Sequence, residues 1–176
     1  MPEQSTAKHA KLPPELTRKI IILVAKIVAV LLVIYILLFR IFGFARIDTN
    51  VMSPSISGGD LAILYHLDGD YSVGDVVMYR CGERNCVGRV AAKAGDTVDY
   101  NNGKFTVNGH LDEQKAYGDN AIPENSSIKY PYRVGDKSIF ILGDNRNETE
   151  DSRSFGAINY SDVICRVIGL FRTHDI

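Results

Sequence analysis

The charged segment Gly143–Gly156 contains the residues best suited to chemistry in this 176-residue chain. It mixes carboxylates, arginines and small polar side chains, and it follows the apolar run Ser138–Leu142, which predicts a β-strand. The segment is too charged to be buried without partners and too interrupted by turn residues to form a helix. Taken alone it predicts a polar surface turn. Asp151 with Arg153, or with Arg89, could form a charge-assisted pair that holds it to a strand.

The order of residues in the charged segment resembles the last motif of the type I signal peptidases, which are membrane-anchored endopeptidases with a serine nucleophile and a lysine base. The match consists of Gly-Asp-Asn-Arg, then Asp-Ser-Arg, then an aromatic residue and glycine. Further segments are similar to the other motifs of that family, and together they cover most of the chain from the apolar N-terminal run to near its end. These segments are Val51–Ile56, Gly74–Tyr79, Gly88–Asp96 and Lys104–Gly109.

Both catalytic positions of that family are substituted here. In the register of the motifs, Val51 stands at the nucleophile position and Gly88 at the general-base position. Valine offers no nucleophile, and glycine has no group that can accept its proton. Met52 and Pro54 fix the first motif and Arg89 fixes the second, so a misalignment of both is hard to sustain. The resemblance therefore predicts a family member without its catalytic dyad.

Two nearby residues could replace the dyad. Ser53 would face the same side as Val51 in an extended segment, although Pro54 restricts the backbone there. Lys93 lies five positions after Gly88, and in a regular strand this odd spacing turns it to the opposite face. An active peptidase with Ser53 as nucleophile is thus the alternative to an inactive chain.

Other parts of the family's site persist in the sequence. The resemblance implies a hydroxyl that helps to bind an oxyanion at Thr49, a hydroxyl that orients the base at Thr149, and a bracing pair at Asp151 and Arg153. Since no base remains to be oriented, we expect these residues to act as scaffold. The full expected set is Thr49, Met52, Pro54, Arg89, Asp144, Asn145, Arg146, Thr149, Asp151, Ser152 and Arg153.

The remaining reactive residues give weaker signals. Asp48 lies near the site by sequence, but it could act as a base only if its pKa were raised. The spacing of histidines, cysteines and acidic residues predicts no metal site, and we expect no cofactor. Cys81 and Cys86 flank four residues between two expected strands, where a local disulfide is plausible in an oxidising compartment. Cys165 lies in an apolar run and predicts a buried thiol.

The apolar run at residues 20–42 predicts a transmembrane anchor, because it is long enough to cross a bilayer and contains neither proline nor glycine. A cleavable signal peptide is the competing interpretation, but the run is too long and no cleavage site follows it. Lys26 is expected to reach the interface with its amine. The basic residues before the run predict a cytoplasmic tail at residues 1–19 and an extracytoplasmic domain at residues 43–176.

The rest of the chain predicts an all-β domain built from hairpins, because short apolar runs alternate with turn signals and no long helical period appears. The expected strands are Leu61–Tyr65, Val76–Arg80, Val87–Ala92, Thr97–Tyr100, Lys104–Val107, Ser138–Leu142 and Val163–Phe171. Residues Ala116–Lys129 are polar and irregular, and they predict a loop or lid. The net charge of -1 gives no indication of a nucleic-acid partner.

Degenerate signal peptidase-like proteins occur in the pilus-assembly gene clusters of some Gram-positive bacteria, where they support pilin polymerisation by sortases without evident peptidase chemistry. The resemblance therefore implies a cell-surface accessory or chaperone that holds a pilin, a sortase or a signal-peptide-like extended segment in the former substrate cleft. The alternative function is an active signal peptidase in protein secretion that uses Ser53. A soluble self-cleaving repressor of similar fold is disfavoured by the anchor and by the lack of a DNA-binding segment.

Overall fold

The computed structural model describes residues 13–67, 69–101, 103–112, 114, 116–118, 122–124, 126–147 and 151–172. The chain divides into two compact units, Met1–Arg40 and Ile41–Ile176. The second unit is mostly β-structure, and the first contains one long helix, so the predicted class of an all-β domain with one N-terminal apolar helix is confirmed.

Helix α1 spans Pro14–Ile41, and none of its residues is buried. Its 28 residues extend roughly 42 Å at helical rise, more than the hydrocarbon core of a bilayer requires. It is the one helix in the described part of the chain that is long and apolar enough to cross a membrane. The helix starts before the predicted anchor, because proline is well tolerated in a first helical turn. Residues 14–19 are therefore helical rather than an irregular tail, and Phe42 begins a strand.

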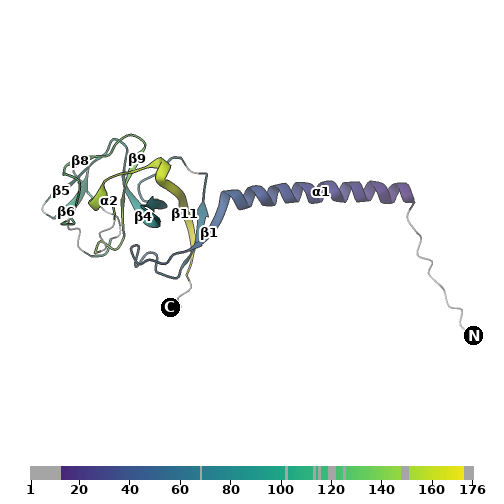
Figure 1. Ribbon diagram of the computed structural model, residues 1–176, viewed down its shortest axis with the longest axis horizontal. Coiled ribbons are helices and arrows are strands. Elements are labelled where there is room, and N and C mark those ends of the chain that lie inside the picture. The colour runs from purple at the N-terminus through teal and green to yellow at the C-terminus, as the bar shows by residue number, and fades with distance from the viewer. Residues whose placement is uncertain are drawn as a thin grey trace, which may run out of the picture. The chain divides into compact units, whose positions relative to one another are not determined.

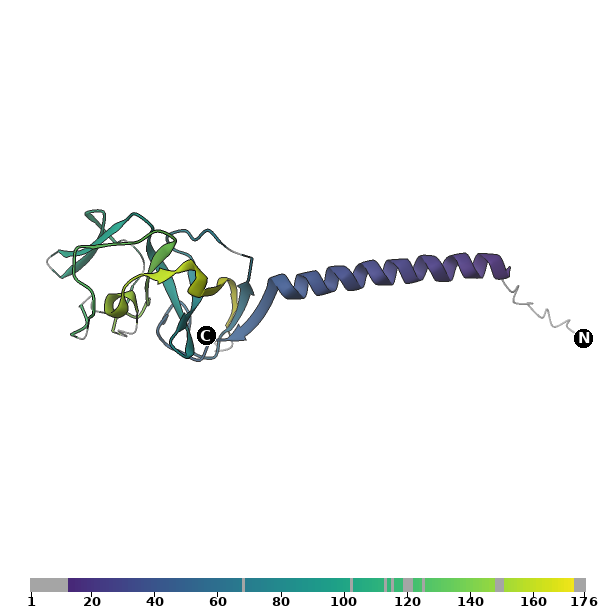
Figure 2. The same cartoon turned by 45° about the horizontal axis from the view of Figure 1, so that its top comes forward.

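The second unit contains two antiparallel sheets, seen at opposite sides of the domain in Figures 1 and 2. The seven-stranded sheet has the order β1 (Phe42–Arg46), β2 (Leu61–Tyr65), β11 (Val163–Phe171), β3 (Val76–Cys81), β4 (Arg84–Lys93), β9 (Ser138–Leu142) and β10 (Ile158–Asn159). The four-stranded sheet has the order β7 (His110–Leu111), β6 (Lys104–Val107), β5 (Thr97–Asn101) and β8 (Tyr132–Arg133). A short helix α2 (Ser152–Phe155) and a 3-10 turn (Tyr160–Asp162) complete the described elements.

Each predicted strand is present, because its apolar residues point into a core. The Asn108–Gly109 turn joins β6 to β7 with positive φ at both residues, as a tight hairpin requires. Between residues 116 and 129, the described part contains no helix or strand and one isolated bridge, from Tyr117 to Asn145. The expectation of an irregular segment is thus confirmed for the residues described.

Strand β9 is the centre of the domain, since all five of its residues are buried. Phe140 and Leu142 pack into a cluster shared with the four-stranded sheet, whereas Ile139 and Ile141 pack into a second cluster with β3 and β4. The charged segment begins directly after Leu142. Its start is therefore fixed by a strand that is held on both faces.

Candidate functional site

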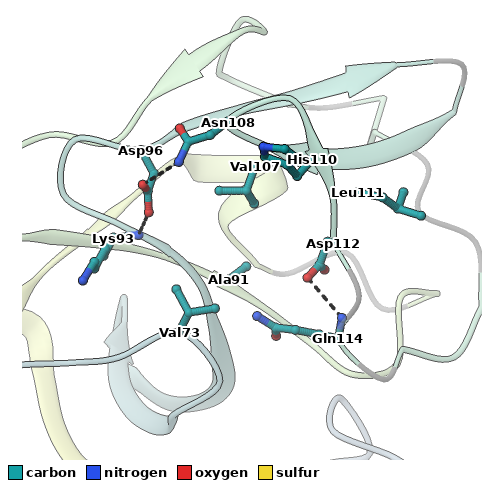
Figure 3. A pocket seen from close by; sticks show the side chains of 10 residues that line it. All are labelled: Val73, Ala91, Lys93, Asp96, Val107, Asn108, His110, Leu111, Asp112 and Gln114. Atoms are coloured by element: carbon teal, nitrogen blue, oxygen red, sulfur yellow. Dashed lines mark hydrogen bonds between the residues drawn. The ribbon is translucent and has the colours of Figure 1, made fainter.

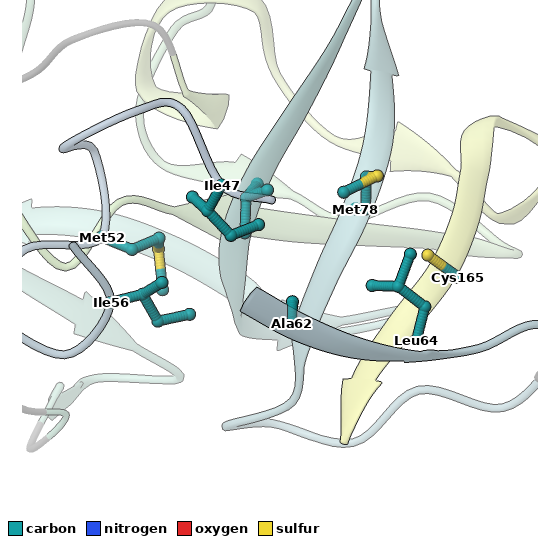
Figure 4. Close-up of a cluster of buried hydrophobic side chains, with 8 residues drawn as sticks. Ile47, Met52, Ile56, Ala62, Leu64, Met78 and Cys165 are labelled. Atoms are coloured by element: carbon teal, nitrogen blue, oxygen red, sulfur yellow. The ribbon is translucent and has the colours of Figure 1, made fainter. Parts of the chain in front are cut away.

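Val51, which the resemblance assigns to the nucleophile position, lies on a turn anchored in the core. Met52 and Ile56 are buried beside Ile47, as Figure 4 shows. The N–H of Ser53 donates to the carbonyl of Asn50 at 3.0 Å, so the segment turns immediately after Val51. The segment is therefore not extended, which was the condition under which Ser53 would share a face with Val51. Pro54, in the same turn, is exposed.

Val51 is connected to two residues of the expected site. Its N–H donates to the hydroxyl of Thr49 at 3.2 Å, and its carbonyl accepts from the N–H of Asn145 at 2.9 Å. Gly143 packs against it so closely that an added Cβ would lie 2.7 Å from the Cγ1 atom of Val51. The structure therefore brings the first motif and the charged segment together, although they are about ninety residues apart in sequence.

Gly88, which the resemblance assigns to the base position, lies in β4, where packing leaves no room for a side chain. Gly88 is buried, and a Cβ added there would collide with the Cγ2 atom of Ile141 and lie 3.3 Å from the carbonyl oxygen of Leu142. Tyr79 is the next neighbour, at 3.6 Å. A lysine at this position would be surrounded by apolar atoms, which is the environment that lowers the pKa of an amine and makes it a base.

The charged residues that the structure describes in this segment are buried, so for them the prediction of a polar surface turn was wrong. Asp144, Arg146, Asp151, Ser152 and Arg153 are all at most 2 % exposed. Burial is possible because each charge has a partner of opposite sign. Four residues of the segment also form the helix α2, whose first turn is capped by the carboxylate of Asp151.

Asp151 and Arg153 form the pair at the centre of this segment. The guanidinium Nε and Nη2 of Arg153 donate to the carboxylate at 2.9 Å each, and the N–H of Gly143 donates to it at 3.1 Å. Burial by itself lowers the pKa of Arg153, but the hydrogen bonds and charge of Asp151 outweigh it and raise the pKa. Ser152 accepts the N–H of Ile141 at 2.9 Å, which ties the segment back to β9.

Two further pairs connect the charged segment to distant parts of the chain. Arg89 donates two hydrogen bonds to Asp144, at 2.8 and 2.7 Å, and these bonds raise the pKa of Arg89 against the effect of its burial. Arg146 donates to Asp112 at 3.0 Å. The sequence left open whether Asp151 binds Arg153 or Arg89, and the structure assigns it to Arg153. Asp112 was missed because its separation from Arg146 follows no motif.

Two cavities, of about 110 and about 320 Å³, have Thr49, Asn85 and Val87 in common among their lining residues, and the smaller one also touches Val51. Together we call them the groove. The smaller cavity is also lined by Val51, Arg84 and Cys86. The walls of the larger cavity also include Ala45, Arg46, Ile47, Asp48 and Met78. The side chain of Asp48 is 85 % exposed, so it lacks the desolvation that a carboxylate base needs. No lysine or histidine is among these lining residues.

A larger cavity of about 700 Å³ lies elsewhere, between the end of β4 and the β6–β7 hairpin (Figure 3). Lys93 lines this cavity together with Ala91. A bulge between Val90 and Ala92 pairs Lys93 with Ile139 and overturns the odd-spacing argument, which assumed a regular strand. Even so, five residues of strand separate Lys93 from Gly88 by roughly 16 Å, so it cannot replace the base.

The remaining predictions concern Thr149, the three cysteines and a metal site. Thr149 lies outside the described residues. Cys81 and Cys86 carry thiols, with no disulfide in the described part of the chain, and Cys165 is buried as expected. Burial raises the pKa of the Cys165 thiol to about 11. The described residues contain no cluster of histidine, cysteine and acidic side chains that could hold a metal ion.

Comparisons with known proteins show which sequences resemble this chain. A family model described as "Signal peptidase, peptidase S26" matches residues 20–171. A protein named "Inactive signal peptidase IA" from Staphylococcus aureus is 27% identical over 149 residues, which are 81% of this chain and 85% of that protein. A "Signal peptidase I" from Bacillus caldolyticus is 29% identical over 149 residues, covering 73% and 79%.

A solved structure is also similar. It is the crystal structure of a signal peptidase I from Enterococcus faecalis, with 21% sequence identity and a TM-score of 0.45. The similarity covers 57% of this chain and 97% of that chain.

Proposed function

The chain belongs to the signal peptidase family, peptidase S26, and we propose that it is an inactive member that binds an extended peptide segment at the membrane surface. In this proposal it is an accessory or chaperone in sortase-mediated pilus polymerisation, and its ligand is a segment of a pilin or of an assembly partner. The observation that carries the proposal is that Val51 and Gly88 carry no reactive group, whereas the described charged residues beside them keep buried partners.

Inactivity is supported by geometry as well as by residue type. The side chain of Ile141 takes up the space where the Cβ of a lysine at position 88 would lie. Thr49 is the hydroxyl that lines the groove next to Val51, but it accepts the Val51 N–H and has no lysine or histidine beside it in the groove. A hydroxyl without a base is a weak nucleophile at neutral pH.

Peptide binding is supported by the edge of β4. The register pairs β4 with β9 from Arg89 to Lys93, so the half of β4 from Arg84 to Gly88 pairs on one side with β3 and turns its other edge to the groove. An extended peptide can add to such an edge through its main chain, and alternate side chains then enter pockets. This mode gives affinity without catalysis.

The groove favours an uncharged, apolar sequence. Ile47, Met78 and Val87 form apolar walls in the larger cavity, whereas the cavity beside Val51 admits only a small side chain. Arg46 and Asp48 lie at the exposed rim, where their charges remain solvated. We therefore propose a ligand with one small and one larger apolar residue on the same face of an extended strand.

The proposal also places the β-domain outside the cytoplasm and gives it a partner in pilus assembly. The basic residues that precede α1 favour a cytoplasmic N-terminus and an extracytoplasmic β-domain. The role in pilus assembly rests on the resemblance to degenerate members of the family in pilus-assembly gene clusters. A cell-surface site would place the groove where pilins emerge from the membrane.

A binding and cleavage assay tests the proposal. The full chain in detergent micelles is incubated with a labelled signal-peptide segment, and cleavage and fluorescence anisotropy are both measured. We expect binding without cleavage. Methylation of the alternate peptide N–H groups that face β4 should abolish binding, whereas methylation of the other alternate set should not. Cleavage by the natural chain that Ser53→Ala removes would instead establish the active alternative.

A reconstruction tests inactivity directly. We expect no cleavage from the natural chain and cleavage from the triple change Val51→Ser, Gly88→Lys and Ile141→Ala. The double change without Ile141→Ala should cleave more slowly, because Ile141 displaces the new lysine. A triple variant that folds but never cleaves would show that the site has lost more than its dyad.

A cellular assay tests the pilus role. Thr49→Arg should fill the groove and reduce the ladder of polymerised pilins on immunoblots of the producing cells. Thr97→Arg, at a partly buried position in the other sheet, is the matched control and should leave the ladder intact. Equal ladders from both variants would refute a role for the groove in assembly.

A further inference from the structure

Two thiols lie on the same face of the β3–β4 hairpin. Cys81 is directly opposite Arg84, and Cys86 is directly opposite Tyr79, so the two cysteines occupy diagonal positions on one face. Both pack against the cluster that contains Tyr79, Val90 and Ile141. This face also holds Gly88, two residues further along β4.

The hairpin end that carries these thiols is also a wall of the groove. Arg84, Asn85, Cys86 and Val87 line the cavity of about 110 Å³ beside Val51. Any movement of the hairpin end relative to β3 therefore changes the shape of that cavity. A chemical change at Cys86 would be felt at the position where a peptide side chain enters.

We propose that Cys81 and Cys86 form a dithiol site that reacts with an external disulfide, such as oxidised glutathione or the disulfide of a thiol oxidoreductase, and that the resulting Cys81–Cys86 disulfide reshapes the groove. The coupling to ligand binding rests on the proposed function of the groove, whereas the thiol chemistry does not. Reduction by external thiols reverses the change.

The reaction proceeds by two exchanges. The Cys86 thiolate attacks one sulfur of the external disulfide, forming a mixed disulfide and releasing the first external thiolate. The Cys81 thiolate then attacks the Cys86 sulfur and releases the second. The two protein sulfurs are oxidised, the external disulfide is reduced to two thiols, and the two cysteine protons pass to the released thiolates.

The hairpin geometry makes the disulfide reversible rather than permanent. Diagonal Cα atoms in an antiparallel pair lie about 7–8 Å apart, somewhat beyond the usual Cα separation of a disulfide. The two strands must therefore shift toward each other, and the turn at Gly82 and Glu83 is the short connection that moves with them. Arg84 lies on the same face as both sulfurs, where its positive charge can stabilise the negative charge that is shared between sulfurs during the exchange.

The test uses the full chain in detergent micelles, equilibrated in glutathione buffers from reducing to oxidising. Disulfides are mapped by mass spectrometry after alkylation, and methyl NMR follows Val51 and Val87 at the groove. We expect an intramolecular Cys81–Cys86 disulfide in oxidising buffers, with shifts of both methyl groups and none at Val98 in the other core cluster. Cys81→Ser should trap a glutathione adduct on Cys86.

Controls separate the chemistry from general oxidation. Cys165 should remain reduced throughout, because burial raises its pKa to about 11 and leaves little thiolate. Arg84→Gln should slow the reaction several-fold, whereas Arg80→Gln, on the opposite face of the hairpin, should not. Failure of the disulfide to form in any buffer would overturn the inference. A disulfide that leaves the Val51 and Val87 signals unchanged would overturn its coupling to the groove, and neither result depends on whether the groove binds peptide.

Discussion

Val51 contacts the charged segment, and Gly88 lies beside Leu142, which directly precedes it, yet these two expected catalytic positions differ strongly from the segment in chemical character. Val51 and Gly88 carry no group that can attack or accept a proton, and the space at Gly88 is taken by Ile141. The neighbouring Gly143–Gly156 retains buried arginines and carboxylates with short, well-aligned hydrogen bonds. The expected catalytic side of the site thus lacks reactive groups, whereas the buried polar framework on the other side has its charges paired.

This difference indicates that the framework is needed for folding. A buried charge that has lost its partner is strongly destabilising, so a pair such as Asp151 and Arg153 cannot be lost one residue at a time. Val51 is only partly buried and Gly88 carries no side chain, so changes there were not constrained in this way. Substitutions in the charged segment should therefore destabilise the chain more than substitutions at Val51 or Ser53.

Asp151→Asn should have the largest effect, because it leaves Arg153 fully buried without a counter-charge. Removing one partner of a buried pair typically costs about 3–5 kcal/mol, and we expect a loss of this size in the free energy of unfolding measured with urea. Arg46→Gln is the matched control, because its pair with Asp48 is exposed and 3.8 Å long. It should change nothing measurable. A small loss from Asp151→Asn would mean that the framework is not structural.

Gly88→Lys should have the next largest effect. Overpacking a core costs about 1–3 kcal/mol, and here the added side chain must displace the buried Ile141. Ile141→Ala leaves a cavity and destabilises the chain by itself, but the double variant should lose clearly less than the sum of the two. Urea unfolding of the four chains gives this coupling. Strict additivity would show that Ile141 does not close the base position.

The sequence predicted the strands better than it predicted which residues are buried. Strands such as Leu61–Tyr65 and Ser138–Leu142 were predicted with their observed bounds, because apolar runs with turn signals at each end are a local pattern. Two-residue strands such as His110–Leu111 contain no such pattern.

The errors at the site have a common physical cause. The burial of the charged segment depends on Asp112 and Arg89, which reach it from other parts of the chain, and no spacing reveals them. The extended backbone assumed for Ser53 is absent because the chain turns there. The strand face expected for Lys93 is wrong because β4 contains a bulge. Both break the alternation on which the argument from sequence depended.

Tyr100→Phe should have a smaller effect that depends on pH. Burial raises the pKa of Tyr100 to about 12, and its hydroxyl lies near the Arg153 guanidinium without a hydrogen bond of good geometry. The substitution should therefore cost little stability at neutral pH. The unfolded chain loses the phenolic proton first, near pH 10, so stability falls as the pH rises from about 10 to about 12. In the variant, stability should fall less over this pH range, as measured by urea unfolding at a series of pH values. An unchanged profile would show that Tyr100 is not the group responsible for the fall.

Ser53→Ala should have the smallest effect of all, and Ser152→Ala is its matched comparison. Both substitutions delete one hydroxyl, but Ser53 is partly exposed on a turn held by backbone hydrogen bonds, whereas Ser152 is fully buried and accepts the N–H of Ile141. Leaving that N–H without an acceptor should cost about 1–3 kcal/mol in urea unfolding, whereas we expect Ser53→Ala to change neither stability nor cleavage. Equal losses of stability in the two variants would contradict the view that the buried charged segment is needed for folding whereas the Ser53 hydroxyl is not. A cleavage activity that disappears with Ser53 would instead mean that the nucleophile had moved two residues along the chain.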